Sequence, residues 1–223
     1  MSDGESPLAL QLAVRVEKLQ PPSIPAICAA AGLATIELLE DERSQSDGQW
    51  FEAVSAWNGS RIRKIVRRGR GAAWEKAQVP DGVTVERDGA EVRAFVPGPL
   101  DQAPGPLAKL QIQSTDLPEP DQDTEPASTP ALVVAVTPLV EMSWGKRAAQ
   151  CAHALQWAWM RSDSTTVAAW NGQGRPITVL HPTERLWREL HVRSDVQIHD
   201  GGFTEIPAGT NTALALWEGF ECS

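Results

Sequence analysis

Apolar and polar residues recur with two different periods along the C-terminal half of the chain. Short apolar runs predict four strands, at 132–136, 176–180, 196–199 and 213–217. Segments with a helical period predict two helices, at 145–160 and 183–190. Strands that alternate with helices are typical of an α/β layer fold with a mixed sheet.

The predicted helix 145–160 carries two stripes of different character. At 3.6 residues per turn one stripe is apolar and should pack on the sheet: Ala148, Ala152, Leu155 and Trp159. The other stripe is polar and follows positions i, i+4 and i+7: Lys146, Gln150 and His153. Ser143 is the expected N-cap, and Gly145 would let a ligand approach the backbone closely.

Residues 114–130 differ in composition from the segments on either side. They are rich in Pro, Asp, Glu, Ser and Thr. Such a segment cannot bury an apolar face, so it is interpreted as an extended acidic linker. It divides the chain into an α/β domain at 1–113 and a second α/β domain at 131–223.

The two halves share a series of ordered similarities. Residues 53–59 (Ala-Val-Ser-Ala-Trp-Asn-Gly) parallel residues 166–172 (Thr-Val-Ala-Ala-Trp-Asn-Gly), and Cys28-Ala-Ala parallels Cys151-Ala-His. We interpret this series as an internal duplication; the alternative is two unrelated α/β domains with coincident tryptophans. The predicted fold is therefore a small mixed β-sheet with helices on both faces, present twice in tandem.

Composition narrows the class of protein. A net charge of −9 disfavours a protein that coats nucleic acid by bulk electrostatics. Cys28, Cys151 and Cys222 are too few for a disulfide framework and suggest a reducing compartment. The polar, acidic N-terminus does not resemble a signal peptide, and no apolar run approaches the roughly 20 residues of a membrane span. The expected location is the cytoplasm, with no membrane partner.

Two motifs of the C-terminal half can be compared with a known family. The first is Met142-Ser-Trp-Gly-Lys-Arg-Ala-Ala-Gln-Cys-Ala-His-Ala, and the second runs from Asp200-Gly-Gly-Phe-Thr to Gly-Thr-Asn-Thr212. In order and spacing they resemble the motifs of the type-2 peptidyl-tRNA hydrolases. The resemblance implies a small mixed sheet, a tendency to dimerise, tRNA as the partner, and Lys146, Asp200 and Thr212 as the catalytic candidates.

The same residues support this chemistry on physical grounds. A lysine near a helix N-terminus can stabilise a phosphate or a developing oxyanion, whereas the simpler alternative is a solvated surface lysine. Asp200 lies in a sharp turn where a carboxylate could activate a water, although Asp-Gly turns are also common without function. The candidates for substrate contacts in this half are Gly145, Gln150, His153, Thr204 and Thr210.

Other kinds of site are not indicated. Cys151 lies beside alanines on a helix that must pack, so it is interpreted as a small buried residue and not as a nucleophile. Cys151 and His153 point in different directions along that helix, so they do not form a metal pair. The sequence has no G-x-S-x-G nucleophile elbow and no Walker phosphate loop. We expect neither a metal nor an organic cofactor.

The N-terminal half lacks the Gly-Lys turn, since Pro22 and Ser23 occupy the equivalent positions. We expect no catalytic site in this copy. Its basic run at 61–70 holds Arg67, Arg68 and Arg70, which could grip the acceptor arm of tRNA; alternatively the charges protect an edge strand. In the first case charge reversal at these arginines should weaken tRNA binding and leave the thermal midpoint unchanged.

The leading hypothesis is a peptidyl-tRNA hydrolase that cleaves the ester between a peptide and tRNA. The alternative is an inactive RNA- or protein-binding module of the same fold, because 137–140 lacks an arginine and an aspartate that are common in the family. Hydrolysis of another acyl ester is a third option. Two copies on one chain could form an intramolecular pseudo-dimer, so the chain is expected to be a monomer, which light scattering would test.

Overall fold

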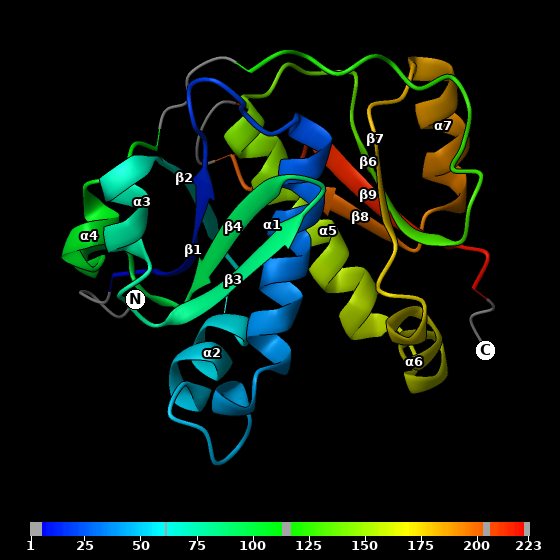
Figure 1. Cartoon of the computed structure of the whole chain (residues 1–223). Coiled ribbons are helices and arrows are strands. Elements are labelled where there is room, and N and C mark those ends of the chain that lie inside the picture. The colour runs from blue at the N-terminus through cyan, green and yellow to red at the C-terminus, as the bar shows by residue number, and fades with distance from the viewer. Residues whose placement is uncertain (1–5, 61, 113–116, 203–205, 221–223) are drawn as a thin grey trace.

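The computed structural model describes residues 6–60, 62–112, 117–202 and 206–220 (Figure 1). The N-terminal half contains the elements β1 (Leu8–Arg15), α1 (Ile24–Glu40), α2 (Phe51–Asn58), β2 (Lys64–Gly69), α3 (Gly71–Ala77), β3 (Gly82–Arg87) and β4 (Ala90–Phe95). The short elements β5 (Gly98–Pro99) and α4 (Gly105–Ala108) follow.

The C-terminal half repeats this series of long elements. It contains β6 (Ala131–Val136), α5 (Trp144–Arg161), α6 (Ser164–Gly172), β7 (Ile177–Leu180), α7 (Glu184–Arg193), β8 (Val196–His199) and β9 (Asn211–Glu218). The four strands and two helices expected in this half are confirmed with small shifts of their ends. The sequence did not predict α6, which contains the repeated Trp-Asn-Gly segment.

The two halves form separate mixed sheets with the same strand order. The order is β2-β1-β4-β3 in the first sheet and β7-β6-β9-β8 in the second. In each sheet the first pair is parallel and the other two pairs are antiparallel. This arrangement confirms the predicted tandem α/β fold, and the shared order is what a duplication would produce.

Each sheet is covered on both faces because its central strand is apolar on both sides. Alternate residues of β6, such as Val134, contact the cluster around α1 and α5, whereas Val133 contacts a second cluster around α7. In β1, Leu12 faces the first cluster, and Ala13 faces a small cluster with Trp74 of α3. Because successive side chains of a strand point to opposite faces, each sheet packs against one group of helices on one face and another on the other face.

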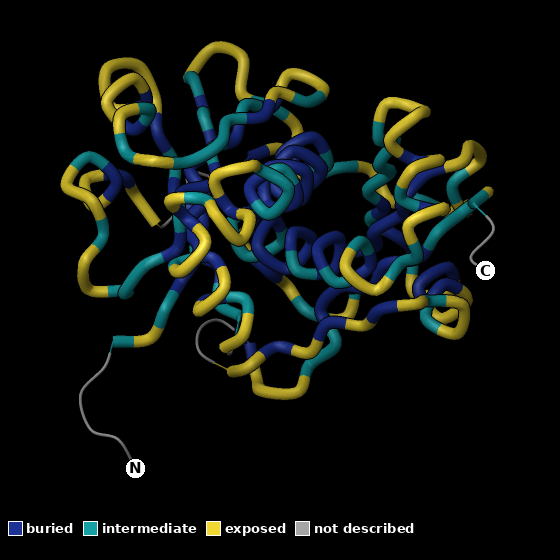
Figure 2. The backbone as a smooth tube through the Cα atoms, turned by 90° about the horizontal axis from the view of Figure 1, so that it is seen from below, coloured by how far each residue is buried: buried dark blue, intermediate teal, exposed yellow. Residues whose placement is uncertain are grey.

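Helices α1 and α5 lie side by side between the two sheets (Figure 1). The buried parts of the chain gather at the centre, and the exposed parts lie at the periphery (Figure 2). The apolar stripe of α5 was expected to pack on the sheet, but Leu155 packs against Gly32 of α1. A Cβ at Gly32 would lie 2.1 Å from Leu155 Cδ1, so the glycine permits this close approach.

Equivalent cysteines meet where the two helices cross. Cys28 and Cys151 are fully buried, and their thiols share a hydrogen bond. That hydrogen bond and burial raise the pKa of Cys151 well above its usual value. A buried thiol of this kind is a poor nucleophile, in agreement with the structural role expected for Cys151. Contact between the two matching positions is what a duplication with a pseudo-twofold arrangement would produce.

Part of the acidic segment lies along the second half. Asp123 accepts a hydrogen bond from the backbone N–H of His181 at 2.7 Å, and its own N–H donates to the His181 carbonyl at 2.9 Å. The division into domains at 1–113 and 131–223 stays a prediction, since one hydrophobic cluster joins residues of both halves. None of the helices in the described ranges combines the length and apolar character that crossing a bilayer requires.

Candidate active site

The first turn of α5 brings Lys146 to the end of β8. Ser143 is the N-cap, as predicted, and its hydroxyl accepts a hydrogen bond from the Lys146 backbone N–H at 3.3 Å. The Lys146 Nζ lies 2.5 Å from Asp200 Oδ2, and the two side chains are only 13% and 4% exposed. Residues 54 positions apart in the sequence thus form a shielded ion pair.

Two further donors hold the carboxylate of Asp200. The Gln150 Nε2 donates to Asp200 Oδ2 at 2.9 Å, and the backbone N–H of Gly202 donates to Oδ1 at 2.8 Å. Lys146 and Gln150 come from adjacent turns of α5, as the polar stripe predicted. A carboxylate restrained by three donors on two elements has a defined orientation.

Thr212 contacts this network through Gln150. Its hydroxyl donates to Gln150 Oε1 at 2.8 Å, which directs the Nε2 of that amide toward Asp200. Thr212 is fully buried and is not among the residues that line the pocket described below. The Thr212 hydroxyl is linked to Asp200 through Gln150, and its expected catalytic role stays a prediction.

A pocket of about 690 Å³ opens beside the ion pair. This volume lies within the range of small-molecule sites, roughly 300–1,000 Å³. The C-terminal half lines it with residues of α5 and the β8 end, including Lys146, Gln150, His153 and Asp200. The N-terminal half lines it with residues that lead into β2, including Ile62, Arg63 and Lys64. The pocket is therefore formed between the two halves.

His153 lines this pocket near Lys64 and Lys146. Burial, followed by the charges of Lys64 and Lys146, lowers the pKa of His153 well below its usual value. Its Nε2 is buried and has no hydrogen-bond partner within the described part of the chain. A neutral imidazole with an unsatisfied nitrogen is suited to a hydrogen bond with a ligand.

Gly145 and Thr210 do not line the pocket. Gly145 faces β2, because a Cβ at this position would lie 3.8 Å from Val66. Thr210 closes a turn, with its hydroxyl donating to the Pro207 carbonyl at 2.8 Å. Thr204 lies outside the described residues. A ligand in this pocket would therefore not be lined by Gly145 or Thr210, and their expected ligand contacts stay a prediction.

The basic run at 61–70 is not a continuous cationic surface. Arg67 is 7% exposed, and its guanidinium donates to Gln11 Oε1 at 2.6 Å and to the Leu110 carbonyl at 3.1 Å. Arg68 binds the side chain of Gln111. Arg70 is exposed, but none of the three arginines lines the pocket. The expected grip by Arg67 is wrong, since its charged group is used inside the fold, and reversing its charge should lower stability.

Sequence reasoning did not identify Lys64 as a pocket residue. Lys64 begins β2 and is 8% exposed. Alternation had placed it on the strand face that carries Val66, and that face contacts α5 of the other half. Its position next to Lys146 and His153 depends on how the halves pack, which no local pattern encodes.

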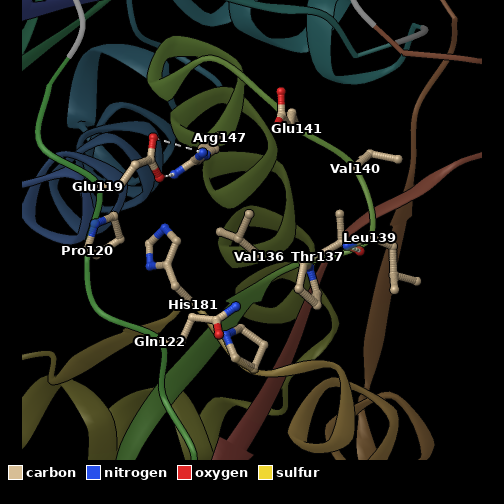
Figure 3. Close-up of a pocket in the computed structure, with 12 residues that line it drawn as sticks. Glu119, Pro120, Gln122, Val136, Thr137, Leu139, Val140, Glu141, Arg147 and His181 are labelled. Carbon is tan, nitrogen blue, oxygen red and sulfur yellow. Dashed lines mark hydrogen bonds and ion pairs between the residues drawn. The ribbon is translucent and has the colours of Figure 1, made fainter.

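A second, smaller hollow of about 250 Å³ lies at the carboxyl ends of the parallel strands β6 and β7 (Figure 3). Its lining includes Thr137, Arg147 and His181, and it shares no residue with the larger pocket. Glu119 closes one side through a hydrogen bond of 2.5 Å to Arg147. The His181 ring points toward this pair, and neither of its nitrogens has a partner among the described residues (Figure 3).

His181 is expected to make the protein less stable in mild acid. Burial, and next the charge of Arg147, lowers the pKa of His181 from 6.5 to about 4. Between these values the unfolded chain binds more protons than the folded one, so stability should fall as pH drops from 6.5 toward 4. The His181 share of this loss is about 3 kcal/mol.

Urea unfolding of wild type and His181→Gln at pH 7, 5.5 and 4 measures this share. The difference in unfolding free energy between the two proteins should shift in favour of the variant as pH falls. His199→Gln, at an exposed histidine, is the matched control and should follow wild type. Parallel pH curves for wild type and His181→Gln would contradict the assignment.

Comparison with known proteins identifies relatives of the C-terminal half. The family model "Peptidyl-tRNA hydrolase PTH2" matches residues 131–217. Proteins named "Peptidyl-tRNA hydrolase" from two strains of Halobacterium salinarum, R1 and NRC-1, are each 34% identical over 93 residues. Each alignment covers 38% of this chain and 81% of the relative. The matched region contains Lys146, Gln150, Asp200 and Thr212.

Proposed function

The chain belongs to the peptidyl-tRNA hydrolase PTH2 family, and from this premise we propose that its C-terminal half cleaves the ester between a peptide, or an N-blocked amino acid, and tRNA. The observation that carries the proposal is the ion pair of Lys146 and Asp200 at the N-terminal end of α5. Gln150 donates a hydrogen bond to Asp200, and both residues of the pair line the large pocket. Its role in translation would then be to release tRNA from peptidyl-tRNA.

Hydrolysis of such an ester needs a positioned water, an acceptor for its proton and a stabiliser for the oxyanion. In the proposed mechanism Asp200 orients the water and accepts its proton as the water oxygen attacks the ester carbonyl. The Lys146 ammonium group stabilises the negative charge on the carbonyl oxygen. Collapse of the tetrahedral intermediate breaks the bond to the ribose oxygen, which takes up a proton.

The other residues of the network act by orientation. Gln150 holds the Asp200 carboxylate, and Thr212 sets the direction of the Gln150 amide. His153 is placed to bond a hydroxyl or carbonyl of the substrate. The mechanism uses no metal or organic cofactor.

We infer that the N-terminal half has no second site of this kind. By helix alignment, Ser23 and Ile27 occupy the positions of Lys146 and Gln150, and by strand register Glu91 occupies the position of Thr212. This half therefore offers neither the lysine nor the amide that holds a carboxylate. The duplication would then have left one site per chain.

The test is incubation of wild-type protein with N-acetyl-aminoacyl-tRNA. The expected products are N-acetyl amino acid and tRNA with an intact 3′ end. Asp101→Asn, at an exposed aspartate of the other half, is a control that should retain full turnover. Absence of turnover by well-folded wild type that still binds tRNA would instead support a binding module of the same fold.

A further inference from the structure

Lys64 is a buried lysine whose position is set by both halves of the chain. Its Nζ donates to Gln156 Oε1 of α5 at 2.5 Å and lies 5.2 Å from the centre of the Trp57 ring. Gln156 is itself fixed, because its Nε2 donates to Asn58 Oδ1 at 2.8 Å. Lys64 lines the pocket, and these contacts hold its ammonium group in a fixed position.

Among the described residues, Lys64 forms no ion pair. Within the described ranges no carboxylate lies at ion-pair distance from its Nζ. Buried lysines are usually paired, because an ammonium carries three donors and a full charge. The amide of Gln156 satisfies one donor only. Burial accordingly lowers the pKa of Lys64 well below its usual value, and an anion in the pocket would favour the charged form again.

The charge of the pocket points to an anionic ligand. Among the described residues, its lining holds three cationic side chains, Arg63, Lys64 and Lys146, and one carboxylate, Asp200. Lys146 is paired with Asp200, so the N-terminal half adds further positive charge to the lining through Lys64. This positive charge contrasts with the net charge of −9 for the whole chain.

The duplicate position shows that the strand itself does not require a lysine. Lys64 follows Trp57 by the same spacing as Ile177 follows Trp170. Lys64 pairs with Leu10 of β1, and Ile177 pairs with Leu132 of β6, at the same place in each sheet. An apolar residue is thus sufficient for the fold at this position, and the lysine occurs in the copy that faces the Lys146–Asp200 pair.

We propose that Lys64 binds a phosphate of the 3′-terminal nucleotides of the RNA, so that the N-terminal half completes the substrate site of the C-terminal half. This inference rests on the proposed function, which places the terminal ester at Lys146 and Asp200. The phosphodiester next to that ester is the anion that an RNA substrate brings into the pocket, and backbone contacts of this kind position nucleic acid without reading its sequence.

Binding of an uncharged RNA that ends in CCA tests the contact without requiring turnover. Fluorescence anisotropy compares wild type with Lys64→Met, and with Lys18→Met at an exposed lysine as the matched control. Lys64→Met should raise the Kd about tenfold and reduce the slope of log Kd against log salt by about 0.7. Lys18→Met should change neither quantity.

Lys64→Arg keeps the charge and should retain the salt slope, which separates loss of charge from loss of packing. It also serves as the folded comparison if Lys64→Met has a lowered thermal midpoint. An unchanged Kd and slope in folded Lys64→Met would overturn the proposal.

A pair of ester substrates separates phosphate binding from chemistry. Lys64→Met should raise KM about tenfold for N-acetyl-aminoacyl-tRNA and leave hydrolysis of N-acetyl-aminoacyl-adenosine, which has no phosphate, unchanged. An equal loss of kcat on both substrates would overturn the phosphate assignment in favour of a role at the ester. If wild type cleaves neither substrate, the proposed function fails, whereas the anisotropy comparison still decides whether Lys64 binds RNA phosphate.

Discussion

Lys146→Met is expected to lower kcat for N-acetyl-aminoacyl-tRNA about 10²- to 10³-fold, because it removes the charge that we propose stabilises the oxyanion. The methionine retains most of the length of the side chain, so packing at the start of α5 should be little changed. The substitution also removes one of the three donors that hold Asp200 and leaves Gln150 and the Gly202 N–H in place. Single-turnover kinetics at saturating enzyme measure the effect on the chemical step.

A double-mutant cycle with Asp200→Asn tests whether the two residues act as one unit. Asp200→Asn alone should cost about 10²- to 10⁴-fold in kcat, since the acceptor for the water proton is lost. If Lys146 and Asp200 act together, the double variant should be no slower than the slower single variant. Lys76→Met, at an exposed lysine of α3, is the control. Activity of Lys146→Met within threefold of wild type would contradict the assigned role.

Leu155→Ala is expected to lower the free energy of unfolding by about 2–5 kcal/mol. Leu155 is fully buried at the crossing of α5 and α1, where it fills the space left by Gly32. Since α1 and α5 belong to one hydrophobic cluster, both halves should lose stability and unfold in a single transition. Urea denaturation followed by tryptophan fluorescence and by circular dichroism measures both properties.

The facing glycine supplies a second test of the same contact. Gly32→Ala should destabilise the protein by about 1–3 kcal/mol through overpacking against Leu155. The double variant Gly32→Ala, Leu155→Ala should be less destabilised than the sum of the single variants, because the new methyl enters the space vacated by Leu155. Leu19→Ala, at a leucine that is 96% exposed, is the control. Two separate unfolding transitions would show that the halves do not share their stability.

Local patterns in the sequence predicted the C-terminal elements and the polar face of α5. The sequence predicted the polar stripe of Lys146, Gln150 and His153, because helix geometry alone places positions i, i+4 and i+7 on one side of the helix. Ser143 was recognisable as the N-cap because its hydroxyl satisfies an N–H of the same turn. Helices α2 and α6 were missed, since the tryptophans, asparagine and glycine in them have weak helix propensity and owe their conformation to the burial of Trp57 and Trp170.

The sequence by itself determined the tandem α/β organisation and the residues available for chemistry, because these follow from periodicity, repetition and motif spacing. Only the tertiary structure decided what those residues touch. The Arg67 guanidinium donates to Gln11 inside the fold, and the Thr212 hydroxyl donates to Gln150. Lys64 belongs to the first half but lines the pocket that contains Lys146 and Asp200. The physical reason is that burial and pairing of a polar side chain depend on elements distant in sequence, which meet only when α1 packs against α5.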